Sequence, residues 1–327
     1  MFESKLPFGW SDLEDGAAER YTTKHKDSLV RDGQVRCCVR DCKNWLSRRK
    51  RGIAPEFCPD HGISMSVSPT YVYRNPLDNF IIARDLVSSV EKVERWRLGN
   101  ERSEDALSWN VFVSLARLGI LGAAIPELGS GTENVELYLW GNRIDDGKHR
   151  LWDKLDGVRK TLEPGTAFPT EPDIMLRVPG HALVLIEAKF GSPNSTLAGK
   201  EDRFESVEDF LARYPTPEGA ADPLARDWIE QQQLGTVLEQ LCRNVVYATW
   251  LAEPREQPTV INLVRREAEP DVESRLRPHL AKNGRAIFRR LAWESFQPVF
   301  AARGSEATPV VDYLENKTMN LRRAFRL

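Results

Sequence analysis

The sequence has no long hydrophobic run, few cysteines and almost no net charge. Its longest purely apolar stretch covers residues 182–186, whereas a membrane-spanning helix needs roughly 20 apolar residues in succession. Internal repeats and low-complexity segments are also missing. We therefore expect a soluble protein with no membrane partner, and its 327 residues are enough for two domains.

Cysteine is scarce, and four of the five cysteines lie between residues 37 and 58. The first residues do not read as a secretion signal, so we expect reduced thiols and a cytoplasmic protein rather than disulfides. The pair Cys37 and Cys42 is followed, after fifteen residues, by the pair Cys58 and His61. Two short-spaced ligand pairs separated by a loop can hold Zn²⁺ tetrahedrally, so the spacing predicts a structural Cys3His zinc site.

Cys38 is an alternative to Cys37 as the first zinc ligand. The segment is similar to small zinc ribbons and treble-clef fingers, which read Cys-x-Val-x-x-Cys with a later Cys-x-x-His. That form selects Cys37, Cys42, Cys58 and His61. The plainer interpretation is a set of free thiols in a small domain.

An acid and a lysine follow the apolar stretch at residues 182–186. This stretch predicts a buried strand that continues into Glu187, Ala188 and Lys189. Side chains alternate along a strand, so Glu187 and Lys189 share one face and Ala188 points to the other. The plainer interpretation is an exposed strand end that carries an ordinary ion pair.

A second strand is predicted at residues 171–178, directly before this one. If residues 179–181 form a three-residue connection, the antiparallel pairing brings Asp173 level with Glu187. Two carboxylates at one place repel each other unless a divalent cation lies between them. The two strands therefore predict a metal site.

These residues resemble the signature of the PD-(D/E)XK nuclease superfamily. Pro172 and Asp173 are followed, after thirteen residues, by Glu187, Ala188 and Lys189. Other acid-x-Lys triplets occur in the sequence by chance, but only this one ends an apolar run and follows a Pro-Asp strand start. The resemblance implies an α/β fold with a restriction-endonuclease-like core, in which helices flank a mixed central β-sheet.

The resemblance also implies roles for these residues. Asp173 and Glu187 would hold one or two Mg²⁺ ions, or Mn²⁺, together with the carbonyl oxygen of Ala188. Lys189 would orient or deprotonate the attacking water, and cleavage of the P–O3′ bond would leave a 5′-phosphate. An acid on the first helix of such enzymes often joins the metal site, and this makes Glu104 a candidate catalytic residue.

The flanking segments predict the same order of elements. Residues 103–118 predict a helix with Ser103 as its N-cap, where Glu104 could instead complement the helix dipole. A strand is predicted at residues 134–140, a long helix at 234–250 and another strand at 260–264. Helix, three strands, helix and strand is the core order of the superfamily.

The long helix carries polar residues at helical spacing. Gln240, Arg243 or Asn244, and Tyr247 fall on one face. This face could contact the substrate, but packing and capping roles are favoured.

A basic segment lies between the two zinc-ligand pairs. Residues 20–51 contain eleven Lys or Arg and three Asp, although the whole chain has a net charge of −2. The cluster Arg48, Arg49, Lys50 and Arg51 predicts a phosphate-binding surface held by zinc, and duplex DNA is its expected partner. The alternative is a solvated run of charge.

These observations predict two domains. Residues 1–98 would form a zinc-binding module together with a connecting helix at residues 77–96, and residues 99–327 would form a nuclease domain. We expect a Mg²⁺-dependent DNA endonuclease with a restriction or phage-defence role, associated with the nucleoid when bound. It could form a homodimer or take a defence-system partner subunit. One alternative is a zinc-finger adaptor with a nuclease-like scaffold. Another is a nuclease for RNA or branched DNA, although no aromatic-rich platform for single strands is visible.

Overall fold

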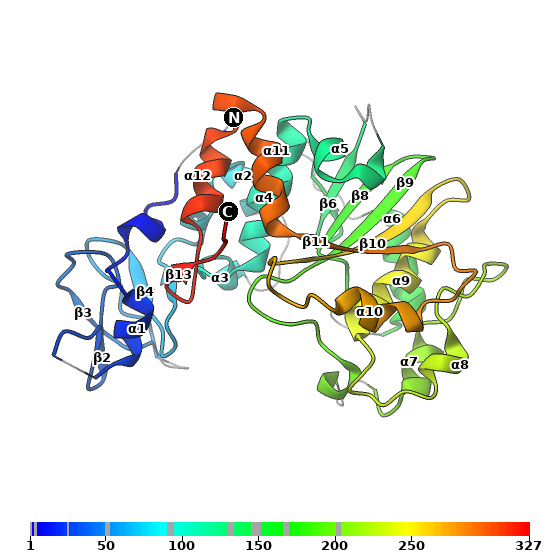
Figure 1. The fold of residues 1–327 in the computed structure, drawn as a ribbon, viewed down its shortest axis with the longest axis horizontal. Coiled ribbons are helices and arrows are strands. Elements are labelled where there is room, and N and C mark those ends of the chain that lie inside the picture. The colour runs from blue at the N-terminus through cyan, green and yellow to red at the C-terminus, as the bar shows by residue number, and fades with distance from the viewer. Residues whose placement is uncertain are drawn as a thin grey trace. The chain divides into compact units, whose positions relative to one another are not determined.

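The chain forms two compact units (Figure 1). The terminal unit comprises Met1–Leu118 and Phe296–Leu327, and the central unit comprises Gly119–Ser295. The computed structural model describes residues 2, 5–24, 26–49, 53–89, 95–129, 134–144, 152–165, 170–200 and 204–327. The expected limits of the zinc-binding module (1–98) and the nuclease domain (99–327) stay a prediction.

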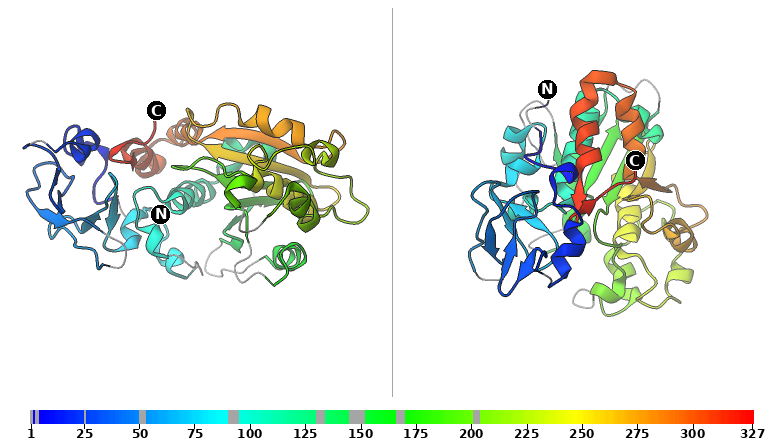
Figure 2. Two further views of the ribbon diagram at one scale, coloured as in Figure 1. Left: turned by 90° about the horizontal axis from the view of Figure 1, so that it is seen from below. Right: turned by 60° about the vertical axis from the view of Figure 1, so that its left-hand side comes forward.

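Short helices and small antiparallel sheets make up the described part of the terminal unit. Its helices are α1 (Ala17–Thr22), α2 (Arg84–Ser89), α3 (Arg95–Leu98), α4 (Glu104–Arg117), α11 (Phe296–Ala301) and α12 (Thr308–Asn316), with 3-10 helices η1 (Trp10–Asp12), η2 (Pro76–Asn79) and η7 (Gly304–Ala307). Its sheets are β1-β2-β3 (Val30–Arg31, Gln34–Arg36, Trp45–Ser47), β4-β5 (Ile63–Met65, Tyr71–Tyr73) and β12-β13 (Thr318–Met319, Arg322–Arg323). Helices α11 and α12 lie side by side (Figure 2), and α12 packs against α4.

Helix α4 begins as the sequence predicts. The Ser103 hydroxyl accepts a hydrogen bond from Ala106 N (3.2 Å), which satisfies one of the amide groups left open at a helix start. Glu104 is the first residue of the helix, followed by Asp105. The predicted helix at residues 103–118 is confirmed.

The predicted connecting helix at residues 77–96 is wrong in its first part, and its residues 90–94 lie outside the described residues. The 3-10 helix η2 ends at Asn79, and non-helical chain leads to α2, with a bend at Ile81 and Ala83 at a left-handed φ of 52°. Asn110 of α4 stabilises this non-helical chain, because its side chain accepts from Ile81 N (3.0 Å) and donates to the carbonyl oxygen of Asn79 (2.9 Å). A buried side chain from another helix thus replaces the backbone hydrogen bonds that a helix would have made.

A mixed six-stranded sheet forms the framework of the described part of the central unit (Figure 1). In spatial order its strands are β11 (Ile287–Ala292), β10 (Gln257–Val264), β9 (Ala182–Ala188), β8 (Ile174–Val178), β6 (Glu136–Leu139) and β7 (Asn142–Arg143). Strands β9, β10 and β11 are parallel, and the pairs β8-β9, β6-β8 and β6-β7 are antiparallel. The predicted mixed α/β architecture is confirmed.

The hairpin of β8 and β9 has the predicted connection and register. Residues 179–181 join the strands, and His181 N donates to the carbonyl oxygen of Val178 (2.9 Å). Gly180 takes a φ of 73°, a left-handed conformation that suits glycine. The paired residues run from Val178 with Ala182 to Ile174 with Ile186. One step further in this register, Asp173 lies level with Glu187.

Helices cover the sheet, and α9 lies closest to the hairpin. The helices of the central unit are α5 (Leu121–Ala124), α6 (Asp153–Leu162), α7 (Val207–Arg213), α8 (Arg226–Ile229), α9 (Glu239–Leu251) and α10 (Val272–Leu276), with 3-10 helices η3 (Pro126–Leu128), η4 (Leu197–Lys200), η5 (Arg277–His279) and η6 (Trp293–Ser295). Helix α9 packs against β9 and β10, and Leu183 and Leu185 of β9 share its buried core. Because strand side chains alternate, Glu187 lies on the same face as these leucines.

Helix α9 begins later than the predicted range of 234–250. Residues 234–238 form turns and a bridge, in which Leu238 pairs with Thr196. Gly235, a weak helix former, lies in this segment. None of the helices that the structure describes is both long and apolar enough to cross a bilayer.

Candidate functional site

Four side chains that could bind a metal ion converge in the terminal unit, and they lie on or beside turns. Cys37 directly follows β2, and Cys42 comes after the next turn. Cys58 and His61 belong to a second turn just before β4, where Gly62 N donates to the carbonyl oxygen of Cys58 (2.8 Å). Within the described part of the chain, this is the only group of three or more His, Cys, Asp or Glu ligand atoms placed to share a metal ion.

The distances within this group fit a tetrahedral metal ion. The Sγ atoms of Cys42 and Cys58 are 3.7 Å apart, and His61 Nδ1 lies 3.4 Å from Cys58 Sγ and 3.6 Å from Cys37 Sγ. Zinc bonds of about 2.3 Å to sulfur and about 2.0 Å to nitrogen would place neighbouring ligand atoms roughly 3.5–3.8 Å apart. The cluster could therefore hold Zn²⁺, and the selection of Cys37 rather than Cys38 agrees with it.

Asn44 supports this cluster, and the sequence alone did not predict its role. Its side-chain amide donates to the Sγ atoms of Cys42 (3.5 Å) and Cys58 (3.3 Å) and to Asp60 Oδ2 (2.6 Å). Burial opposes ionisation of Cys58, but hydrogen bonds from His61, Asn44 and nearby backbone amides outweigh it and lower the pKa of this thiol to about 7. Such hydrogen bonds orient metal ligands and favour the thiolate that binds the ion.

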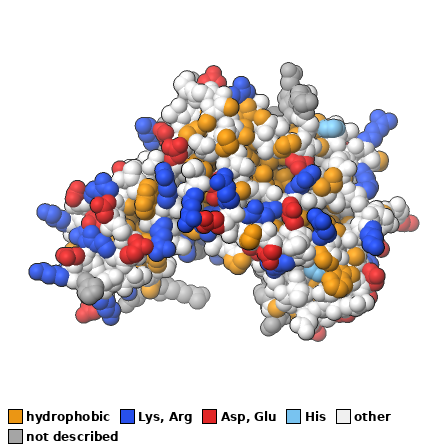
Figure 3. All heavy atoms as spheres, viewed as in Figure 1, with side chains coloured by type: hydrophobic (Ala, Val, Ile, Leu, Met, Phe, Trp, Pro, Cys, Tyr) orange, Lys and Arg blue, Asp and Glu red, His pale blue; other side chains and the backbone are white. Residues whose placement is uncertain are grey.

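The basic residues at positions 20–51 are better paired than the sequence suggests, and some of them are half-buried. Arg48 and Arg49 are half-buried, and Lys50 and Arg51 lie outside the described residues. Figure 3 shows Lys and Arg side chains interspersed with Asp and Glu on the visible face of the molecule.

Acids that precede the basic segment account for part of this pairing. Glu14 bridges Arg20 (2.5 Å) and Arg36 (3.0 Å), and Asp15 pairs with Arg40 (3.1 Å). The excess of positive charge counted over residues 20–51 is therefore partly neutralised by acids outside that range.

A second group of charged residues lies in the central unit, where the ends of β8 and β9 meet. Asp173 directly precedes β8 and is half-buried, and its Oδ2 accepts a hydrogen bond from Ala188 N (2.9 Å). Glu187 lies near the end of β9 with 1% of its surface exposed, and Lys189, which follows the strand, is 8% exposed. Lys189 Nζ is 2.5 Å from Glu187 Oε1. The predicted acid, acid and lysine thus belong to one pair of strand ends.

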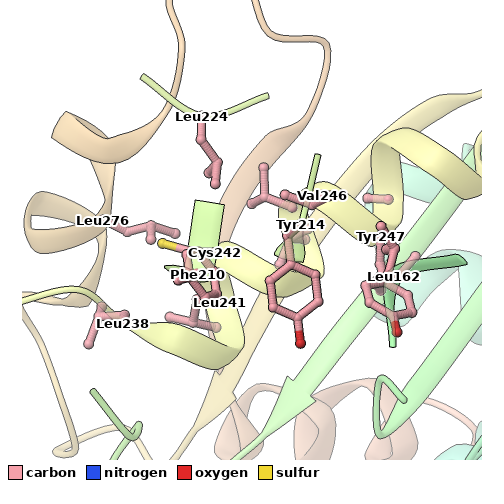
Figure 4. Packing of buried hydrophobic residues seen from close by; sticks show 14 of the residues in the cluster. Leu162, Phe210, Tyr214, Leu224, Leu238, Leu241, Cys242, Val246, Tyr247 and Leu276 are labelled. Atoms are coloured by element: carbon pink, nitrogen blue, oxygen red, sulfur yellow. The ribbon is translucent and has the colours of Figure 1, made fainter. Parts of the chain in front are cut away.

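Helix α9 brings two further polar residues to Glu187. Its apolar side chains, among them Leu241 and Val246, pack into the core shown in Figure 4. Asn244 Nδ2 donates to Glu187 Oε2 (2.9 Å), and Arg243 Nη2 lies 3.7 Å from the same oxygen. Sequence reasoning favoured packing and capping for these residues. Their signal was the placement of an arginine and an asparagine in an otherwise apolar stretch of helix.

Glu187 is held as an anion. Burial alone raises the pKa of its carboxyl group, but the positive charges of Lys189 and Arg243 and the hydrogen bonds from Lys189 and Asn244 outweigh this and lower the pKa below its usual range. Glu187 and Asp173 offer the hard oxygen ligands that Mg²⁺ and Mn²⁺ prefer, and each carboxylate oxygen has two lone pairs. The donor set therefore fits such an ion, although two cationic side chains already compensate Glu187.

Neighbouring residues fix the backbone around this group. Asn262 of β10 is the strand partner of Glu187 on β9, and its Nδ2 donates to the Glu187 carbonyl oxygen (3.2 Å). Lys189 N donates to the Leu263 carbonyl oxygen (2.7 Å), and Trp293 Nε1 donates to the Lys189 carbonyl oxygen (3.2 Å). Rigid elements on both sides thus position the charged side chains.

The other residues of the polar helix face, and the candidate acid Glu104, have their own local settings. Gln240 accepts a hydrogen bond from the Ser195 hydroxyl (2.9 Å), and the Tyr247 hydroxyl donates to the Thr170 carbonyl oxygen (3.5 Å). Glu104 is in the first turn of α4 in the terminal unit, and its role as a further acid stays a prediction.

Comparison with protein-family models, with curated proteins and with solved structures gave no match for this chain. The resemblance to PD-(D/E)XK nucleases therefore rests on the residues of this chain alone.

Proposed function

We propose that this protein is a metal-dependent phosphodiesterase that cleaves DNA, most simply an endonuclease of the PD-(D/E)XK type. The observation that carries the proposal is the register of the hairpin. It sets Asp173 level with Glu187, and Lys189 Nζ lies 2.5 Å from the Glu187 carboxylate. Acid, acid and lysine at two adjacent strand ends form the constellation that the superfamily resemblance implies.

The order of elements supports the same proposal. Along the chain, α4 is followed by the strands β6, β8 and β9, then by α9 and β10. This is the order of helix, three strands, helix and strand that the resemblance implies for the nuclease core. Additional elements, among them α5, β7, α6, α7 and α8, are inserted between these.

The side chains of the site have distinct roles in this proposal. A Mg²⁺ ion held by Asp173 and Glu187, with the Ala188 carbonyl oxygen as a further ligand, would activate water and stabilise negative charge on the phosphate. Lys189 would orient the attacking water through its ammonium donors, or, once it has lost a proton, take the proton of that water as a neutral amine. Asn244 would hold the Glu187 carboxylate in a single orientation through its hydrogen bond (2.9 Å).

The zinc cluster and its basic segment would supply part of the affinity for DNA. Replacing Arg48, Arg49, Lys50 and Arg51 with Ala should weaken duplex binding, because side chains that bind phosphates release counterions from the DNA. Each phosphate interaction that the substitution removes should flatten the dependence of log affinity on log salt by about 0.9. Titration of labelled duplex DNA over a salt series measures both quantities.

The same variant should cleave normally at saturating substrate, since its chemistry lies in the central unit. An unchanged affinity and salt slope would move the DNA-binding surface away from the basic segment. The exposed basic residues near the C-terminus, Arg322, Arg323 and Arg326, would then be the next to replace.

A second candidate function is a zinc-dependent nucleic-acid-binding adaptor that keeps a nuclease-like scaffold. One observation favours it, which is that the cationic side chains of Lys189 and Arg243 lie beside the Glu187 carboxylate and compensate its charge. The presence of Asp, Glu and Lys together argues for the enzyme, because a scaffold does not need all three.

A cleavage assay separates these functions and identifies the substrate. Purified zinc-loaded protein is incubated with supercoiled DNA, linear duplex, branched DNA, single strands or RNA, in Mg²⁺, Mn²⁺ or excess chelator. We expect metal-dependent cleavage of duplex DNA that leaves 5′-phosphates. Binding of DNA without cleavage of any substrate would support the adaptor, and preferential cleavage of RNA or branched DNA would revise the substrate.

A further inference from the structure

Arg243 lies between two buried carboxylates and forms a hydrogen bond with neither. Its Nη2 atom is 3.7 Å from Glu187 Oε2, and its Nη1 atom is 3.6 Å from Glu239 Oε1, one helical turn earlier. The arginine is 3% exposed and Glu239 is fully buried. Charge-assisted hydrogen bonds usually measure about 2.7–2.9 Å, so this guanidinium group is shared between the two acids, and its Nη2 makes only a long hydrogen bond to Asn244 Oδ1 (3.4 Å).

Glu239 has an unusual environment for a buried acid. Neither of its carboxylate oxygens has a hydrogen-bond partner among the described residues, although both are buried. Arg243 Nε is likewise buried without such a partner. Buried ionised groups are costly unless they are paired and hydrogen-bonded, so Glu239 and Arg243 retain unused capacity for each other.

A divalent cation at Glu187 would change the balance around Arg243. A guanidinium group does not lose its proton, so it cannot reduce the repulsion by deprotonation. It can move toward Glu239, and a shift of less than about 1 Å would reach charge-assisted hydrogen-bond distance there.

We propose that Glu239 is a positioning residue that sets the metal affinity of the Asp173 and Glu187 pair by drawing Arg243 away from Glu187. This inference rests on the proposed function, because it takes those two acids as the metal ligands. Arg243 competes with the ion for Glu187, and Glu239 relieves that competition. The two residues therefore act on metal affinity with opposite signs.

The test measures Mn²⁺ binding by electron paramagnetic resonance of the free ion, with full-length zinc-loaded protein. Glu239→Gln should raise the dissociation constant by about fivefold or more, and Arg243→Gln should lower it by a similar factor, in the range of ordinary coupling between sites. The double variant should bind Mn²⁺ like Arg243→Gln, because Glu239 acts only through the arginine.

Glu256→Gln is the matched control for removing a buried carboxylate. Glu256 is fully buried in the central unit and forms an ion pair with Arg177 (2.7 Å). Arg177 lies near the turn of the hairpin, where it pairs with Leu183, at the end opposite to Asp173 and Glu187. Its replacement should leave Mn²⁺ affinity unchanged even where stability falls.

Two results would overturn the inference. Shifts of the same sign in Glu239→Gln and Arg243→Gln, or no shift, would show that the pair only stabilises the fold. Glu239→Gln could fail to fold. In that case, weaker Mn²⁺ binding by both Arg243→Gln and the double variant would also show that the pair only stabilises the fold. Asp173→Asn distinguishes the proposed function: if that variant binds Mn²⁺ like the unmodified protein, the metal site itself is wrong and this inference falls with it.

Discussion

DNA cleavage should fall by at least about a hundredfold when Asp173 is replaced by Asn, with the fold and DNA binding retained. The change removes one of two carboxylates that would hold the metal ion but keeps a side-chain oxygen that can accept from Ala188 N, as Asp173 Oδ2 does at 2.9 Å. Single-turnover cleavage of a labelled duplex, together with thermal unfolding and a binding titration, measures the three properties.

The other two substitutions at this site should abolish cleavage to a similar extent but differ in their effect on stability. Glu187→Gln leaves Lys189 and Arg243 buried beside a neutral group, and unpaired buried charge is destabilising. Lys189→Ala removes one of two cations, so Arg243 still compensates Glu187. We therefore expect the Lys189 variant to unfold at a higher temperature than the Glu187 variant.

Asp156 and Lys160 provide the matched control for these changes of charge. They form an ion pair (2.6 Å) on α6, with 37% and 76% of their side chains exposed. Asp156→Asn and Lys160→Ala should leave cleavage unchanged. Normal turnover by purified Lys189→Ala would show that the proposed mechanism is wrong.

Local signals in the sequence predicted the elements that depend on adjacent residues. The Ser103 cap and the hairpin register depend on side-chain chemistry and chain geometry within a few residues, and both are confirmed. The Cys3His cluster that could hold zinc was predictable for the same reason, since each pair, Cys37 with Cys42 and Cys58 with His61, is close in sequence.

Contacts between distant segments account for what the sequence did not predict. Asn110 holds the chain around Ile81 in a non-helical conformation, which no residue within 77–96 signals. Arg243 and Asn244 reach Glu187 only because α9 packs on β9, more than fifty residues away in sequence. Helical spacing identified the polar face but could not identify its partner.

Removal of one predicted zinc ligand should release the ion and loosen the surrounding segment. Cys42→Ser and Cys58→Ser should each lose the single zinc expected per chain, because a structural site needs all four ligands and binding of the ion contributes directly to folding. Both cysteines lie in a buried core shared with Leu46, Ile63 and Tyr71, so hydrogen exchange over residues 30–65 should accelerate. Elemental analysis measures the zinc content, and hydrogen exchange measures how far the surrounding segment is loosened.

The central unit should keep its protection in these variants. Its buried core, built on β9 and α9, is distinct from the core that contains the cysteines. Exchange in β9 and α9 therefore provides an internal reference within the same sample. Equal acceleration in both cores would show that the zinc cluster supports the whole chain.

Cys38→Ser is the control that tests which cysteine binds the ion. Cys38 is as deeply buried as Cys37 and belongs to the same core, so its replacement perturbs packing to a similar degree. Only Cys37 lies in the ligand cluster, with its Sγ atom 3.6 Å from His61 Nδ1. Cys38→Ser should therefore retain one zinc per chain and Cys37→Ser should lose it. The reverse result would assign the ligand to Cys38, and absence of zinc from unmodified protein prepared without chelator would contradict the site.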